Sequence, residues 1–189
     1  LFTSSVFLLL LLLTFVIFYS PWSEKYQPLI LLLSSFVFYA YHVPTLLLLL
    51  IISLIANAYI SNKIAYSKTI KMLFLLRTGI VINLSFLFFF KYAKLFYSTF
   101  LLDLLGPNEG VDSIILPIGI SFYTFQGISL LVDIYYQRKE NKSVSLIEKN
   151  IFKNFIRTGF YISFFPQLIA GPIMRSMDFL PQIRTKKIS

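Results

Sequence analysis

Polar residues arranged in a pattern that could do chemistry fall in two stretches of this 189-residue chain. The first is a polar face on an otherwise apolar run, whose members lie within roughly 80° of arc if the run is a helix with about 100° per residue. They are Gly119, Phe122, Gln126, Ser129 and Asp133. Such a face is expected to point into a helical bundle, where Gln126 and Asp133 would line a pathway or orient a substrate. The alternative is that Gln126 bonds a neighbouring helix while Asp133 pairs with Arg138 or another cation.

The second stretch, from Ser163 to Arg175, reads S-F-F-P-Q-L-I-A-G-P-I-M-R. It is apolar enough to enter a bilayer, but three residues interrupt any regular helix through it, namely Pro166, Gly171 and Pro172. Broken backbone at membrane depth is tolerated only where protein or water satisfies its N–H and C=O groups. The stretch therefore predicts the wall of a site, bracketed by Gln167 and Arg175; a plain kinked helix is the alternative. Arg175 could hold a phosphate or carboxylate, or serve as an interfacial anchor.

The chain contains no cysteine and one histidine, His42. The absence of cysteine excludes disulfides, thiolate metal sites and cysteine nucleophiles. His42 lies in a short turn before Pro44 with no acidic partner nearby in the sequence, whereas a general base usually has a residue that orients it. We interpret His42 as a surface or interface residue. The motifs of serine hydrolases, zinc proteases and P-loop proteins are absent, so the residues alone predict no catalytic residue, no metal site and no assigned reaction.

Composition indicates an integral membrane protein. Hydrophobic residues make up 57% of the chain and charged residues only 13%, whereas soluble domains are about half apolar and about a quarter charged. The charges are grouped between long apolar runs, as in proteins with several membrane spans. The formal net charge of +9 comes from Lys and Arg in short connections, which set topology and meet anionic headgroups rather than forming a nucleic-acid-binding face.

Five apolar runs are predicted to be membrane helices of an all-α bundle, which we treat as one transmembrane domain over residues 1–189. They are residues 2–19, 28–41, 44–59, 72–90 and 114–136. The last would carry Pro117 in its first turn, where a missing N–H is harmless. Asn83, in the middle of the fourth run, is expected to bond a neighbouring helix. Residues 149–158 alternate basic and apolar side chains and are predicted to lie on the membrane surface.

The charges of the connections predict a topology. Residues 61–71 and 137–157 are basic, and residues 91–113 between them are not. Two basic connections separated by an even number of spans lie on one side, which the positive-inside rule makes cytoplasmic. The N-terminus would then lie outside the cell membrane. The basic tail, residues 184–187, would also be cytoplasmic, which is easiest if residues 159–173 enter the membrane and return.

Four stretches resemble the membrane-bound O-acyltransferase family, most closely its alginate O-acetyltransferase branch. They are L-P-I-G-I-S-F-Y-T-F-Q (Leu116–Gln126), D-I-Y (Asp133–Tyr135), Ser163–Arg175 and D-F-L-P-Q (Asp178–Gln182). Weaker apolar matches extend the resemblance nearly from end to end. A branch that D-alanylates teichoic acids shares the S-F-Y-T-F and G-P-I signals, but the longer Pro166–Arg175 pattern is closer to the alginate type.

The resemblance implies transfer of an acyl group, most simply acetyl, to hydroxyls of an exported or cell-envelope polysaccharide. It implies a ring of membrane helices around a thinned centre, an acyl donor such as acetyl-CoA or an acyl carrier, and a histidine acting as general base. In some such systems a periplasmic or extracellular acyltransferase partner completes the transfer. The tunnel wall would then include Gln126, Asp133, Gln167 and Arg175. Neither a resident cofactor nor nucleic acid is expected.

The chain departs from this family in length. Members run well over twice as long, and their active-site histidine lies in the later half, so the chain is expected to be an N-terminal part that is inactive alone. Two alternatives come from other classes: a transporter or export subunit in which Asp133 and Arg175 handle a moving substrate, and a scaffold subunit without chemistry. No internal repeat is visible, which counts against a transporter.

Overall fold

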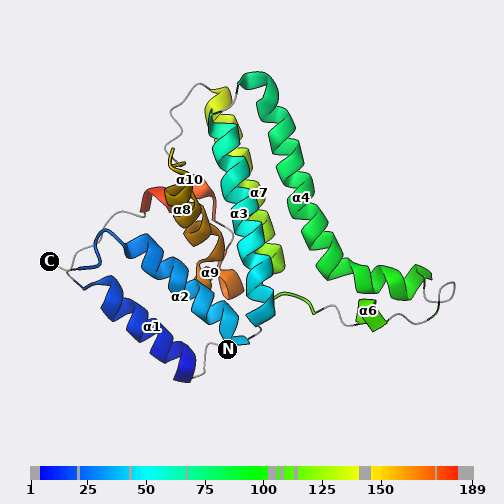
Figure 1. The fold of residues 1–189 in the computed structure, drawn as a ribbon, viewed down its shortest axis with the longest axis horizontal. Helices are drawn as coiled ribbons and strands as arrows, with labels where there is room; N and C mark the ends of the chain where they lie inside the picture. The colour runs from blue at the N-terminus through cyan, green and yellow to red at the C-terminus, as the bar shows by residue number, and fades with distance from the viewer. Residues whose placement is uncertain are drawn as a thin grey trace.

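The computed structural model describes residues 5–20, 22–42, 44–66, 68–101, 106, 109–112, 115–140, 146–172 and 174–182, and every regular element among them is helical (Figure 1). The elements are α1 (Ser5–Phe18), α2 (Gln27–His42), α3 (Pro44–Tyr66), α4 (Thr69–Phe96), η1 (Tyr97–Leu101), α6 (Glu109–Asp112), α7 (Ile120–Lys139), α8 (Ile151–Ser163), α9 (Phe165–Ala170), α10 (Ser176–Phe179) and η2 (Leu180–Gln182).

The long helices α3, α4 and α7 pack side by side (Figure 1). Two glycines allow their close approach. A Cβ on Gly79 of α4 would lie 2.5 Å from Leu131 of α7, and one on Gly127 of α7 would lie 2.8 Å from the Asn57 side chain of α3. Gly79 also faces Ile60 of α3. These contacts make α7 parallel and α4 antiparallel to α3, with small residues at the interfaces as in membrane bundles.

Two helices among the described residues are long and apolar enough to cross a membrane, Pro44–Tyr66 and Lys71–Leu101, while Ser5–Phe18 and Gln27–Tyr41 are shorter apolar helices. The predicted end of the third run at residue 59 is wrong. The helix continues to Tyr66 because its last turns are packed: Ile64 and Ala65 are buried, and Ser61 Oγ donates to the Ala58 carbonyl at 2.9 Å.

The predicted start of the 114–136 run is also wrong. Ile114 lies outside the described residues, residues 115–117 are not helical, and α7 begins at Ile120, so Pro117 precedes the helix. Gly119 has a φ of +74°, a left-handed conformation that cannot continue a right-handed helix. The Tyr39 hydroxyl of α2 donates to the Ile118 carbonyl at 3.0 Å. This hydrogen bond holds the residues just before α7 against α2.

The boundary expected near residue 158 is absent, because α8 is one helix from Ile151 to Ser163. The Asn150 side chain caps it by accepting hydrogen bonds from Phe152 N and Lys153 N at 2.9 and 3.2 Å. Only its first three residues are exposed. Further along, Asn154 is buried against α3 and donates to the Ala58 carbonyl at 2.8 Å. Thus α8 is a packed helix with an exposed first turn.

The basic connections lie at one end of the α3–α4–α7 bundle. Because α3 and α7 are parallel and α4 runs the other way, the end of α3, the start of α4 and the end of α7 meet (Figure 1). Exposed lysines at this end are Lys63, Lys68, Lys71 and Lys139. We call it the basic end. Residues 141–145 and the basic tail 184–187 lie outside the described residues.

Candidate functional site

The chain from α8 to α10 reverses direction along α7. At the start of α7, a Cβ on Gly119 would lie 2.9 Å from Leu168 Cγ of α9. Eight residues after Leu168, the Ser176 hydroxyl of α10 donates to Asp133 Oδ2 at 2.7 Å. Asp133 is fourteen residues beyond Gly119, or about 21 Å further along the helix axis. The segment therefore forms a hairpin beside α7 rather than a straight rod (Figure 1).

Two interruptions build this hairpin. The first is at Phe164, between α8 and α9, and Pro166 follows as the second residue of α9, where its missing N–H costs little. The second is at Gly171, where a Cβ would lie 2.5 Å from Gln167 Cγ. Gln167 is buried, and its Nε2 donates to the Pro172 carbonyl at 2.6 Å. The predicted break residues thus lie at or next to both interruptions.

The start of α9 is held by a side chain from α2. The Phe165 N–H donates to Ser35 Oγ at 3.2 Å, and Ser35 is itself buried. Ser35→Ala would leave this buried N–H without its acceptor, which costs about 1–2 kcal/mol. We expect a correspondingly lower free energy of unfolding in a detergent-denaturation titration. Ser98→Ala, which removes an exposed hydroxyl bonded to Leu95 O, should change it by less than about 0.5 kcal/mol. Equal losses for both variants would contradict the role of Ser35.

The polar face of α7 is packed inward at its two most polar positions. Gln126 is 1% exposed and Asp133 is 8% exposed, whereas Gly119, Phe122 and Ser129 are half-buried. Neither the Nε2 nor the Oε1 atom of Gln126 has a hydrogen-bond partner in the described part of the chain. Unpaired buried polar groups are costly, so this face holds hydrogen-bonding capacity that the described residues do not use.

Asp133 accepts a hydrogen bond from Ser176, a partner that the sequence did not predict. A second bond reaches the same segment, because the Tyr161 hydroxyl of α8 donates to the Met174 carbonyl at 2.8 Å. Between these two attachments lies Arg175, whose side chain is exposed. Sequence reasoning missed Tyr161 and Ser176. In the sequence, each of them is only a hydroxyl-bearing residue within or beside an apolar run. Such residues also occur at many positions without a function.

Asn83 forms the expected contact between helices. Its Nδ2 donates to Asn57 Oδ1 at 3.0 Å, and Asn57 Nδ2 donates to Asn83 Oδ1 at 3.1 Å. Both residues are buried. This reciprocal amide pair joins α3 to α4 opposite Gly127 of α7, so it holds the bundle on which the polar face is carried.

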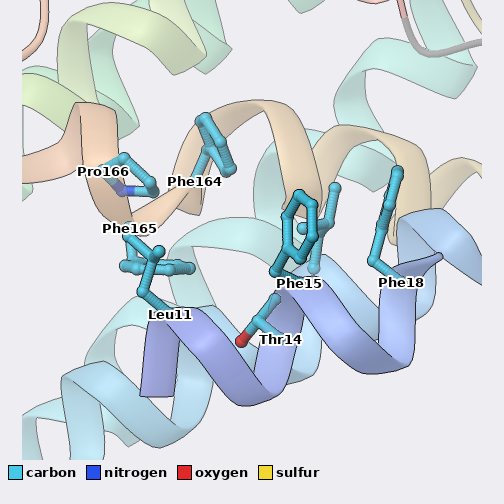
Figure 2. Close-up of a pocket in the computed structure, with 8 residues that line it drawn as sticks. Leu11, Thr14, Phe15, Phe18, Phe164, Phe165 and Pro166 are labelled. Carbon is cyan, nitrogen blue, oxygen red and sulfur yellow. The ribbon is translucent and has the colours of Figure 1, made fainter. Parts of the chain in front are cut away.

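An apolar groove of about 190 Å³ lies where α1 and α2 meet the Phe164–Pro166 turn (Figure 2). Thr14 is the hydroxyl-bearing residue of its lining, and its Oγ1 donates to the Leu10 carbonyl at 2.7 Å and lies 2.9 Å from Ser34 Oγ. The other lining side chains are Leu11, Phe15, Phe18, Leu31, Phe164, Phe165 and Pro166. This lining offers apolar contact and cannot orient a polar substrate.

His42 ends α2, and its side chain lies outside what the structure describes. Among the described residues, no group of three or more His, Cys, Asp or Glu side chains could hold a metal ion. Of the residues predicted from the sequence, Gln126 on α7 offers hydrogen bonding and Arg175 offers positive charge.

Comparison with known proteins identifies relatives. A probable alginate O-acetylase of Pseudomonas aeruginosa is 35% identical over 186 residues, which is 96% of this chain and 34% of that protein. A peptidoglycan O-acetyltransferase of Helicobacter pylori is 35% identical over 172 residues, covering 82% of this chain and 32% of that protein. A probable alginate O-acetylase of Azotobacter vinelandii is 33% identical over 188 residues, which is 96% of this chain and 35% of that protein. No family model and no solved structure matches the chain.

The chain spans about a third of the length of these relatives. Together, the relatives and the two long apolar helices indicate a membrane protein. Over most of its length the chain is similar to alginate and peptidoglycan O-acetyltransferases, which confirms the predicted resemblance to the alginate O-acetyltransferase-like branch of the membrane-bound O-acyltransferases.

Proposed function

We propose that this chain is part of a membrane O-acyltransferase that transfers an acyl group, most simply acetyl, to hydroxyls of an exported or cell-envelope polysaccharide. The observation that carries the proposal is the 35% identity to O-acetyltransferases over most of the chain. One of these relatives is named for alginate and the other for peptidoglycan. The proposal therefore specifies a polysaccharide acceptor as a class, with the acyl donor being acetyl-CoA or an acyl carrier.

The structure supports this proposal because the stretches that carry the family resemblance pack together. The first, Leu116–Gln126, meets the Ser163–Arg175 stretch where Gly119 faces Leu168. Asp133, which opens the D-I-Y motif, bonds Ser176 directly after the second stretch. Residues separated by more than forty positions thus form one wall. An enzyme family in which both stretches serve one tunnel would require this arrangement.

In this proposal the tunnel wall contains the unpaired amide of Gln126, the amide of Gln167, and Arg175 beyond the second interruption. A glutamine amide can donate to a carbonyl and accept from a hydroxyl at once, which suits a site where an acyl group meets an alcohol. The Oε1 atom of Gln167 is also buried and unpaired among the described residues. The general-base histidine implied by the resemblance is placed outside this chain, which we expect to be inactive alone.

We further propose a multi-pass arrangement in the plasma (inner) membrane, with α1, α2, α3, α4 and α7 as spans and α8–α10 as a hairpin that enters and returns. The basic end, with connections 61–71 and 137–157, would be cytoplasmic, and the N-terminus would be outside. A donor would then approach from the cytoplasm, and the polysaccharide, or a periplasmic or extracellular acyltransferase partner, would approach from the other side.

The test is complementation in a bacterium that lacks its own polysaccharide O-acetyltransferase. The protein is expressed from its natural reading frame, and acetate released from the purified polysaccharide by mild alkali is measured. We expect ester-linked acetate with the wild-type protein. Gln126→Leu and Arg175→Ala should each lower it by about tenfold or more, as expected when a positioned polar contact is lost from an active site.

The matched control is Gln27→Leu. Gln27 is a buried glutamine at the start of α2, and its Nε2 donates to the Phe18 carbonyl at 3.1 Å, away from the proposed wall. It should leave acylation near the wild-type level at equal membrane abundance. A wild-type protein that changes the amount of exported polysaccharide without adding acetate would contradict the enzyme and favour a transporter. A scaffold would be favoured if deleting the protein removed another protein from the membrane, while the amounts of polysaccharide and of acetate per copy of that other protein stayed the same.

A further inference from the structure

The residues on both sides of Arg175 are held by buried side chains from two different helices. Before it, the Met174 carbonyl accepts a 2.8 Å hydrogen bond from the Tyr161 hydroxyl of α8. After it, the Ser176 hydroxyl donates a 2.7 Å bond to Asp133 Oδ2 of α7. Tyr161 and Ser176 are fully buried, at 0% exposure. We call these two bonds the clamp.

The backbone of Arg175 is also restrained. It is extended, with φ of −66° and ψ of 146°, and its carbonyl accepts hydrogen bonds from the N–H groups of Asp178 and Phe179, each at 3.1 Å. The side chain, in contrast, is exposed and makes no hydrogen bond or ion pair with the described residues. The position of the Arg175 Cα is therefore fixed by its neighbours, while the five donors of the guanidinium remain available.

We propose that the clamp makes Arg175 an oxyanion-binding residue, with Asp133 and Tyr161 as positioning residues. The ligand is a phosphate or carboxylate group, because a planar guanidinium binds both through two parallel N–H···O bonds. Fixing the backbone in advance lowers the ordering cost of binding. The lysines of the basic end add positive potential on the same molecule, which raises the local concentration of anions. The inference deepens the proposed function, on which it rests for the source of the anion.

This proposal changes the role expected of Asp133. A carboxylate close to an anion site would repel the ligand, so its charge cannot be what the site needs. What the clamp needs is an acceptor oxygen for the Ser176 hydroxyl. An asparagine supplies that oxygen without the charge, and an alanine supplies neither. Asp133→Asn and Asp133→Ala therefore separate a positioning role from a role in which the charged carboxylate handles substrate.

The experiment measures anion binding by calorimetry to the protein expressed from its natural reading frame and held in lipid nanodiscs. The two probes are inorganic pyrophosphate and glucuronate. Saturable binding of pyrophosphate would indicate a phosphate-bearing donor, and saturable binding of glucuronate would indicate a carboxylate-bearing glycan. Arg175→Ala should weaken binding of the active probe by at least about tenfold. Because this side chain is exposed, the variant removes no buried contact.

Loss of one clamp bond in Asp133→Ala, Ser176→Ala or Tyr161→Phe should weaken binding by roughly three- to tenfold. Asp133→Asn should bind within about twofold of wild type or more tightly. Ser163→Ala is the matched control, because Ser163 is equally buried and its Oγ donates only within α8, to the Gly159 carbonyl at 2.7 Å. It should leave binding unchanged.

Three results would overturn the inference: no saturable binding of either probe to wild type, wild-type binding by Arg175→Ala, or equal weakening in Asp133→Asn and Asp133→Ala. None of these readouts requires acyl transfer. Normal polysaccharide acylation together with any of them would leave the proposed function standing. Absent acylation together with the expected binding pattern would remove the proposed function and keep the anion site.

Discussion

Replacing Gly119 with alanine is expected to lower the free energy of unfolding by roughly 2–5 kcal/mol. Two costs add. A residue with a Cβ pays about 1–2 kcal/mol for the left-handed conformation, which Gly119 adopts with a φ of +74°. The new Cβ would also lie 2.9 Å from Leu168 Cγ and 3.0 Å from the Leu168 carbonyl oxygen. Since backbone cannot rotate away, α9 must shift from α7, and such overpacking costs about 1–3 kcal/mol.

The chain supplies a matched control at Gly106. This glycine has nearly the same φ, +76°, but a Cβ there would meet none of the described residues within 4 Å. Gly106→Ala should therefore show the conformational cost alone, about 1–2 kcal/mol. Detergent-denaturation titrations of the two variants give the difference that belongs to the contact between α7 and α9. If both variants lost the same free energy, the close approach at Gly119 would not contribute to holding the hairpin.

The second large effect is expected at the amide pair of Asn57 and Asn83. Leucine has nearly the shape of asparagine, so each single Asn→Leu variant removes one partner and leaves the other amide buried and unpaired. That costs about 1–3 kcal/mol. The double variant replaces both amides with apolar groups of similar shape, which can be nearly neutral. We expect the double variant to be no less stable than either single variant.

A double-mutant cycle on unfolding free energies measures this coupling. In membrane bundles such couplings average about 0.6 kcal/mol and reach about 1.7 kcal/mol. We expect a coupling free energy near the upper end of this range for Asn57 and Asn83, because two hydrogen bonds join the pair and both residues are buried. Additive losses in the cycle would show that the two amides act independently. Asn62→Leu is a useful comparison, since its Nδ2 donates to the Glu148 carbonyl and it lies outside the pair.

Local chemistry made much of the fold predictable. Apolar runs predicted most of the helices, since hydrophobic length is a property of neighbouring residues. Pro166 and Gly171 predicted the interruptions for the same reason: a ring that fixes φ and a missing Cβ act within one turn. The helix ends were predicted less well. Helix α3 runs past Tyr59 because Ile64 is buried by packing, and periodicity within the run contains no information about that.

For the candidate site, the sequence by itself determined which face of α7 is polar, because an angular pattern along one helix follows from 3.6 residues per turn. Only the tertiary structure decided the partners. Asp133 accepts a hydrogen bond from Ser176, 43 residues away. Tyr161 gained its role by lying opposite the Met174 carbonyl. Hydrogen bonds between distant segments depend on how the helices cross and where the chain reverses, and those are set by packing of the whole bundle rather than by any one stretch.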